Sequence, residues 1–327
     1  MTPREVSSAC IGACELAADA CLGCGRQIDD IVAWPTAEDG QRLRILMQAA
    51  RRLSDQTPRP WPRRVRDALG HELVLAAPPR RIVSLVPSQT ELLFDLGLDE
   101  KVVGVSKFCA HPPQARSGRQ RIGGTKTPDI ARIRALAPDF VLANREENRA
   151  EDIAAIGRFA PVYVTDINTL PQALAMMRAV GFALGAEARA AHIAAEIERA
   201  FADLPRLDGL RCAYLIWRQP WMAAGGDTFI GDLLRRLGLV NVFEARPRYP
   251  ELSVDDLIAA APERVLLSSE PYPFKPKHAA ELARALPQAR MVPVDGEMFC
   301  WPGSRLRLAA GYFHDLLPRL AAHEGQW

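Results

Sequence analysis

Four of the seven cysteines of this 327-residue chain lie close together near its start. Cys10, Cys14, Cys21 and Cys24 follow the spacing C-x3-C-x6-C-x2-C, and Gly25 stands directly after the last of them. In a reducing compartment, clustered cysteines serve as metal ligands or redox groups more often than as disulfides. Four thiolates suit tetrahedral zinc or an iron–sulfur cluster, and the spacing does not choose between the two. We therefore predict a metal site at these cysteines.

Composition narrows the class of protein. Hydrophobic residues make up 48% of the chain and charged residues 24%, as in ordinary globular proteins. The net charge of +2 gives no general attraction to nucleic acid. No apolar run reaches the ~18 residues of a membrane span, and the start, MTPREVSSACIG, lacks the basic-then-apolar pattern of a secretion signal. We expect a cytoplasmic protein with no nucleic-acid partner and no membrane insertion.

The first part of the chain predicts a small module and a tether. Residues 1–55 hold the cysteines and a helical stretch, QRLRILMQAARRL. A module of this size is hard to stabilise without a metal. Residues 56–78 include QTPRPWPRRVRDALG, which is rich in Pro and Arg and has no apolar period. This composition favours a solvated linker.

The rest of the chain predicts two α/β lobes. Short β-branched runs alternate with helical stretches over residues 79–168 and again over 207–327, the pattern of parallel sheets covered by helices. The first of these helices has Ser88 at the N-cap position and Glu91 three residues on, a capping box. Between the lobes, residues 169–206 are nearly all strong helix formers and predict a long backbone helix. Two lobes joined in this way would leave a ligand cleft between them.

Residues with ligand-binding chemistry follow the predicted strands, where ligands of parallel sheets bind. In the first lobe they are Lys107, Phe108, Cys109 and His111 after one strand, and Glu146 and Asn148 after another. Cys109 and His111 have the side chains to bind a metal; the alternative is a buried Cys and a His beside a Pro-Pro turn. Glu146 also fits the ordinary preference for acidic residues where a helix begins.

The second lobe adds an aromatic group. Its candidates are Trp217, Arg218 and Trp221 after the strand RCAYLIW, Glu270, Tyr272 and Phe274 after RVLLSS, and Glu297 and Trp301 after MVPV. Aromatic rings with an arginine suit a flat ligand such as a tetrapyrrole, through stacking and cation–π contact. The alternative for the same rings is packing between lobes.

Several ordered motifs resemble a known family of receptors. They are IVSLVPSQTELL from Ile82, IGGT from Ile122, PDI…LAPDFVLA from Pro128, and GDTFI…NVF from Gly226. The stretch over about residues 80–320 is similar to substrate-binding proteins of iron-chelate and cobalamin transporters, which have two lobes and a rigid connecting helix. The resemblance implies a corrinoid or iron-chelate ligand and places an acidic cleft residue at Glu297. It also matches Arg305 to an arginine near the last helix.

The segment from Cys10 to Trp34 resembles a second, short bacterial family. The shared pattern runs through CLGCGR and ends at Trp34. That family has no known function and is often labelled iron–sulfur-like, which implies a metal without identifying it.

One departure from the family pattern concerns docking to a permease. Exported members of the receptor family dock their permease through one acidic residue on each lobe, and the matching positions here are Ala131 and Asp255. The first lobe lacks the charge, which puts permease docking in doubt.

Together these features predict a cytoplasmic, substrate-binding-protein-like receptor for a metal chelate or corrinoid. The chain has no G-x-S-x-G or G-x-x-x-x-G-K-[ST] motif and shows no nucleophile with a base, so we do not expect an enzyme. Two alternatives remain: a chelatase-like enzyme that handles metal tetrapyrroles, and an exported receptor of a cobalamin or iron-chelate transporter.

Overall fold

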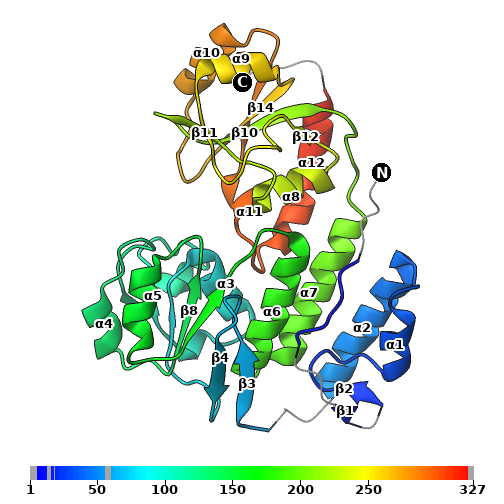
Figure 1. Ribbon diagram of the computed structural model, residues 1–327, viewed down its shortest axis with the longest axis vertical. Coiled ribbons are helices and arrows are strands. Elements are labelled where there is room, and N and C mark those ends of the chain that lie inside the picture. The colour runs from blue at the N-terminus through cyan, green and yellow to red at the C-terminus, as the bar shows by residue number, and fades with distance from the viewer. Residues whose placement is uncertain (1–5, 13–15, 18, 56–59, 323–327) are drawn as a thin grey trace. The chain divides into compact units, whose positions relative to one another are not determined.

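The computed structural model describes residues 6–12, 16–17, 19–55 and 60–322 (Figure 1). The chain forms two compact units. The first comprises Met1–Ile167 and Pro171–Arg199, and the second comprises Asn168–Leu170 and Ala200–Trp327. Among the described residues, no helix combines the length and the apolar character needed to cross a membrane.

A five-stranded parallel sheet forms the centre of the first unit. Its strands are β5 (Ile82–Ser84), β6 (Val102–Val105), β7 (Gln120–Arg121), β8 (Phe140–Asn144) and β9 (Val162–Thr165), in the order β7-β6-β5-β8-β9. Apolar residues such as Val83, Ile133 and Val141 fill the core between the sheet and its helices. The chain builds outward from β5 in both directions, and ligands of such sheets bind at this switch point.

The helices of this sheet are α3 (Pro87–Asp95), α4 (Ile130–Ala135) and α5 (Ala150–Gly157), with short turns η1 (Asp99–Lys101) and η2 (Pro113–Arg116). Helix α3 begins two residues earlier than its capping-box pattern predicts. Val86 is the N-cap and Pro87 occupies the first turn, because proline fixes a helical φ and has no N–H to leave unsatisfied. Ser88 is therefore inside the helix, where it is buried.

The predicted backbone-helix segment is helical but consists of two helices, α6 (Leu170–Leu184) and α7 (Glu187–Ala202), side by side in Figure 1. Gly185 separates them with a φ of +77°, a left-handed conformation that glycine adopts without strain. A Cβ at Gly181 would lie 2.2 Å from the Cβ of Ala190, so the backbone of α6 at Gly181 packs directly against the Ala190 side chain of α7. Helix α7 continues from the first unit into the second at Arg199.

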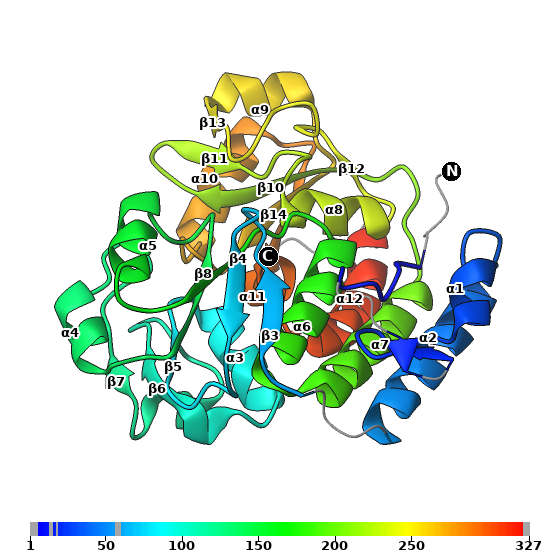
Figure 2. The same ribbon diagram turned by 60° about the horizontal axis from the view of Figure 1, so that its bottom comes forward.

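The cysteine module is part of the first unit. It contains β1 (Leu16–Ala17), β2 (Ala20–Cys21), α1 (Ile28–Ala33) and α2 (Asp39–Asp55), and α2 includes the predicted helical stretch. Ala50 and Leu53 of α2 pack against Ala188 and Ala191, and Figure 2 shows α2 beside α7. The apolar face of α2 is thus buried by tertiary packing.

The stretch predicted to be a linker contains a β-hairpin. Strands β3 (Arg63–Arg66) and β4 (Glu72–Leu75) pair antiparallel. The side chain of Asp67 accepts hydrogen bonds from the backbone N–H groups of Leu69 and His71 at 2.9 and 2.8 Å. Arg63 forms an ion pair with Glu187 at 2.6 Å. Residues 60–78 are therefore tied into the rest of the first unit, and residues 56–59 lie outside the described part.

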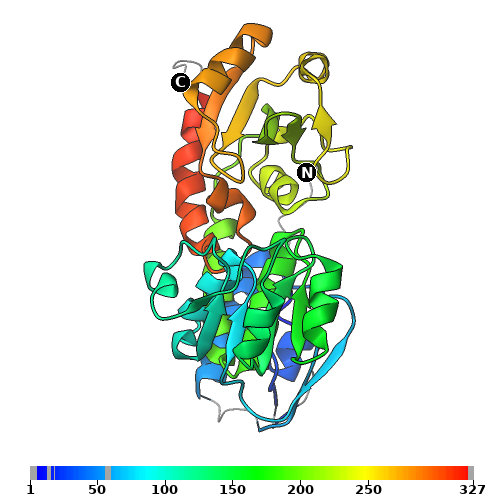
Figure 3. The same ribbon diagram turned by 90° about the vertical axis from the view of Figure 1, so that its left-hand side faces the viewer.

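The second unit is built on a six-stranded mixed sheet. Its strands are β10 (Arg211–Trp217), β11 (Trp221–Ala223), β12 (Val240–Asn241), β13 (Glu251–Leu252), β14 (Arg264–Ser268) and β15 (Arg290–Val294). Strands β10, β14 and β15 run parallel, while β11 pairs antiparallel with β10 and β13. The helices are α8 (Phe229–Arg236), α9 (Val254–Ala260), α10 (Pro276–Ala285), α11 (Gly296–Cys300) and α12 (Leu306–Ala321). Helix α12, red in Figure 3, is tied to β14 by Arg264, whose Nε donates to the Leu320 carbonyl at 2.8 Å.

Candidate functional site

Aromatic side chains gather at the carboxyl ends of β10 and β14 in the second unit. Trp217 ends β10 and is 39% exposed. Its ring meets that of Tyr272 edge to face, with centroids 5.5 Å apart. The Tyr272 hydroxyl lies 3.4 Å from His278 Nε2, so neighbouring residues orient the tyrosine. Trp217 and Tyr272 are two predicted site residues that the structure brings together.

Two other predicted aromatics serve packing. Trp221 is buried and stacks on Phe274 with the planes 1° apart and centroids at 6.0 Å. Both rings belong to the apolar core of the second unit. Arg218 lies over the Trp221 ring at 5.5 Å and forms an ion pair with Glu281 at 2.6 Å. These side chains support the loop that carries Trp217.

Glu270 connects the loops after β14 and β15. Its Oε1 accepts from Trp301 Nε1 at 2.7 Å and from Cys300 Sγ at 2.8 Å. Burial raises the pKa of the Glu270 carboxyl, and the two donors oppose that shift. Trp301 is buried, so it holds the carboxylate in place and offers no exposed stacking face. Cys300 is a neighbour that the sequence analysis missed, although it stands next to Trp301 in the chain.

Glu297 is paired within the same region. Its carboxylate lies 2.9 Å from the buried guanidinium of Arg305. Arg305 also lies 4.9 Å from the centre of the Trp301 ring. The two residues that the family resemblance singled out are therefore partners, and together they support the Trp301–Glu270 contact.

In the first unit, the loop after β6 exposes one aromatic ring. Phe108 is 55% exposed, and the Lys107 ammonium lies 4.9 Å from the ring centre. Cys109 is buried, and its Sγ lies 3.1 Å from Thr90 Oγ1. Burial raises the pKa of the Cys109 thiol, so here the buried-cysteine alternative fits the geometry. His111 is half-buried in the same loop.

Asn148 and Glu146 hold the loop after β8. The buried Asn148 amide donates to the Thr125 carbonyl at 3.0 Å and accepts from Asn144 N–H at 2.8 Å. Lys126 donates to the Glu146 carbonyl. The loop after β7 is thereby tied to the loop after β8.

One further polar residue of this edge was missed. Gln89, in the motif Pro-Ser-Gln at the start of α3, is buried and donates through Nε2 to the Ala143 carbonyl at 3.4 Å. Its Oε1 has no hydrogen-bond partner within the part of the chain that the structure describes. The signal available in the sequence was its position directly after β5, the switch strand of the sheet.

The structure places two of the four clustered cysteines together. Cys21 and Cys24 are buried in one cluster with Val6, Ala9 and Leu46. A hydrogen bond with Cys21, together with burial, raises the pKa of Cys24. Cys10 is exposed, and Cys14 lies outside the described residues. Across the described ranges, no group of three or more metal-ligating side chains is found.

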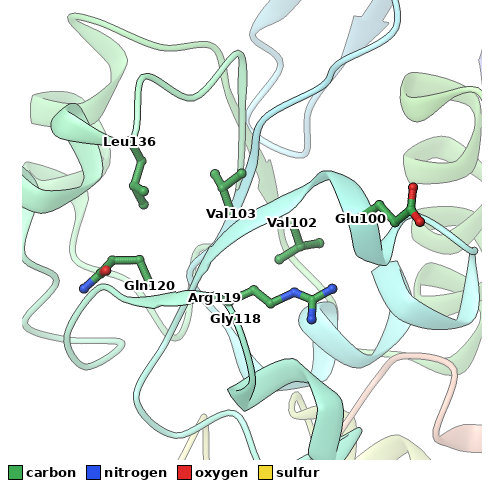
Figure 4. A pocket seen from close by; sticks show the side chains of 7 residues that line it. All are labelled: Glu100, Val102, Val103, Gly118, Arg119, Gln120 and Leu136. Carbon is green, nitrogen blue, oxygen red and sulfur yellow. The ribbon is translucent and has the colours of Figure 1, made fainter.

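A surface pocket of about 660 Å³ lies elsewhere in the first unit, at the amino ends of β6 and β7 (Figure 4). Its lining residues are Glu100, Val102, Val103, Gly118, Arg119, Gln120 and Leu136. Arg119 donates to the Asp99 carbonyl at 2.8 Å, so part of the wall is already hydrogen-bonded. The pocket is at the opposite end of these strands from the predicted ligand-binding loops and contains none of the predicted site residues.

The sequence is similar to one short family and to several vitamin B12-binding proteins. Residues 8–53 match a family described as a protein of unknown function (DUF1289). The vitamin B12-binding protein of Pectobacterium carotovorum is 25% identical over 242 residues, which cover 71% of this chain and 86% of that protein. The vitamin B12-binding protein of Vibrio campbellii is 27% identical over 199 residues, 59% of this chain and 71% of its own.

Solved structures share the fold. The periplasmic vitamin B12 binding protein BtuF of Vibrio cholerae aligns with a TM-score of 0.61 at 21% identity, over 74% of this chain and 98% of its own. The periplasmic heme-binding protein RhuT from Roseiflexus sp. RS-1 aligns with a TM-score of 0.62 at 24% identity, over 74% of this chain and 97% of its own. Both have the two-lobed α/β architecture with a backbone helix that the sequence predicted. Residues 82–285 match the model of the periplasmic binding proteins, and the chain belongs to this family of substrate-binding proteins.

Proposed function

We propose that the ligand is a metal chelate of corrinoid or tetrapyrrole type. The observation that carries the proposal is the exposed Trp217 ring set against Tyr272 at the carboxyl ends of two parallel strands. A flat, rigid ligand gains stacking energy from such rings at little entropic cost. The exposed Phe108 in the first unit is a second ring at a strand end.

The names of the relatives support this class of ligand. The matched sequences are vitamin B12-binding proteins, and one matched structure is a heme-binding protein. Their ligands share a broad macrocycle around a metal, which fits aromatic contacts better than small ions or sugars.

Equilibrium binding to the full chain tests the proposal. Cyanocobalamin, haemin, metal-free protoporphyrin and a ferric siderophore are titrated while tryptophan fluorescence is followed. We expect saturable, one-to-one binding of at least one metal chelate, with the ligand recovered unchanged. If none binds, the proposed ligand class is wrong; if ligand and free metal are converted to a new product, the chelatase-like alternative replaces it.

We also propose that the chain works in the cytoplasm and docks no permease from outside the cell. The support is Ala131, an exposed and uncharged residue of α4 at one of the two positions where the family resemblance implies an acidic docking residue. The other position, Asp255 on α9, is exposed and keeps its charge. Fractionation of the native host should recover the protein with cytosolic markers, and recovery in a periplasmic extract would contradict the proposal.

For the cysteine module we propose a thiolate-bound zinc ion or small iron–sulfur centre. Burial of Cys21 and Cys24 in one cluster supports it. Metal analysis and visible absorption of protein purified without oxygen test it, with Cys21→Ser and Cys24→Ser as loss variants and Cys212→Ala, in strand β10, as control. Metal in the control but not in the loss variants is expected. Equal metal content in all of them, or none in the wild type, would refute the site.

A further inference from the structure

Three buried arginines lie in or beside the cysteine module: Arg26, Arg42 and Arg178. Arg26 lies beside the cysteines, and its Nε donates to Cys24 Sγ at 3.5 Å. Arg178 belongs to helix α6 and is only 5% exposed. Guanidinium groups stay charged in proteins, so Arg26 and Arg178 bring two buried positive charges to this region from segments far apart in the sequence, in addition to Arg42 of α2.

Glu198 is the acidic residue opposite Arg178, and it satisfies the guanidinium only in part. Glu198 Oε2 lies 4.0 Å from Arg178 Nη2, at the limit of an ion pair. Glu198 already accepts hydrogen bonds from Ser7 N–H at 2.7 Å and from Ser7 Oγ at 2.8 Å. Arg178 Nη1 is buried and has no hydrogen-bond partner among the described residues. A buried cation without a full set of partners is strongly destabilising, which points to an anionic group that completes the site.

Contacts join this cation to the cysteines: Ser7, which donates to Glu198, stands next to Val6, and Val6 is buried in one cluster with Cys21 and Cys24. Burial lowers the pKa of the Arg178 guanidinium, and Glu198 opposes that shift. A divalent ion held by several thiolates carries net negative charge, as do iron–sulfur clusters with four cysteine ligands. Such a centre would supply the negative charge that Arg178 lacks.

We propose that Arg178 is the positioning residue through which helix α6 receives the metal-loaded cysteine module, with Arg26 as the second counter-charge. The inference rests on the proposed metal centre. It makes metal binding and the docking of the module onto α6 and α7 a single coupled event, because the charge that is unpaired without metal becomes paired with it. Neither arginine needs to be a metal ligand.

The test uses the full chain with zinc as the probe. One variant removes a positive charge near the cysteines, and another removes a negative charge. Arg178→Met should weaken zinc binding by at least about tenfold, as outer-shell changes do, and should raise the unfolding temperature of the metal-free protein. Glu198→Gln keeps one acceptor oxygen for Ser7, offers an amide N–H that can donate to Ser7 Oγ, and removes a competing negative charge, so it should strengthen zinc retention against a chelator. Arg178→Lys should bind more like the wild type than Arg178→Met does. Arg199→Gln, an exposed change on α7, is the matched control.

The outcomes separate this inference from the metal proposal. Unchanged zinc binding in Arg178→Met, with zinc bound in the wild type, overturns the role of Arg178 and leaves the metal centre standing. No zinc in the wild type, and no cluster after anaerobic reconstitution, overturns both. If Arg178→Met does not fold, Glu198→Gln decides: weaker or unchanged zinc retention contradicts the inference.

Discussion

The indole N–H of Trp301 donates to Glu270 Oε1 over 2.7 Å and thereby joins the loop after β15 to the loop after β14. Both loops lie at the carboxyl edge of the sheet in the second unit. The contact makes Trp301 a positioning residue for the carboxylate.

Replacing Trp301 with Phe tests this relationship. Phenylalanine keeps most of the buried ring but cannot donate a hydrogen bond to Glu270. Because a hydrogen bond to a charged group contributes about 1.5–3 kcal/mol, the free energy of unfolding should fall by a similar amount. Urea unfolding followed by circular dichroism measures it. A Trp301→Phe protein as stable as the wild type would show that the hydrogen bond adds nothing.

Glu270 should make stability depend on pH. Burial raises its pKa in the folded protein, so between the ordinary and the raised values the folded state holds a proton that the unfolded chain has lost. Stability from this group is therefore present at low pH and declines as pH rises through the raised pKa. Glu270→Gln removes this dependence and keeps an acceptor for Trp301. The difference between wild-type and Gln variants in urea midpoint should shift in favour of Glu270→Gln as pH rises; a constant difference would contradict the assignment.

The contact between α6 and α7 predicts opposite effects for two Gly→Ala changes. At Gly181 a new Cβ would collide with Ala190, so Gly181→Ala should destabilise the protein by about 1–3 kcal/mol, the range for overpacking. At Gly157, in helix α5, a new Cβ would meet nothing within 4 Å, so alanine should stabilise by about 0.5–1 kcal/mol. Thermal unfolding distinguishes the two, and equal effects would argue against a close helix contact.

The sequence predicted the parallel sheets well because their central strands, such as β5, β8 and β14, are short apolar runs that are buried along their whole length. The strand predicted at RCAYLIW matches β10 residue for residue. Such local signals are strong when tertiary packing agrees with them.

Predictions failed where distant contacts decide the structure. The hairpin at 63–75 is fixed by Arg63 and by its contact with β9, neither of which is visible in a Pro- and Arg-rich stretch. The split after α6 requires a positive φ at Gly185, whereas helix propensity alone favours continuation.

The candidate site shows the same limit. Strand ends located the loops correctly, but aromatic residue type does not reveal burial. Trp217 is exposed, while Trp221 and Trp301 pack against Phe274 and Glu270. Whether an aromatic ring is exposed for stacking or buried in the core depends on the side chains that pack against it from neighbouring strands and loops, which its own residue type does not reveal.

The most direct test of the central claim is a comparison of chelate affinity between Trp217→Ala and matched variants, using cyanocobalamin and haemin. Loss of a stacked ring should weaken binding by about tenfold or more, from its aromatic contact and its buried area together, with little change in unfolding temperature because Trp217 is exposed. Trp217→Phe should retain most of the affinity. Leu308→Ala, at an exposed position on α12, should bind as the wild type does. If Trp217→Ala binds both chelates with wild-type affinity, the aromatic loops of the second unit do not form the ligand site.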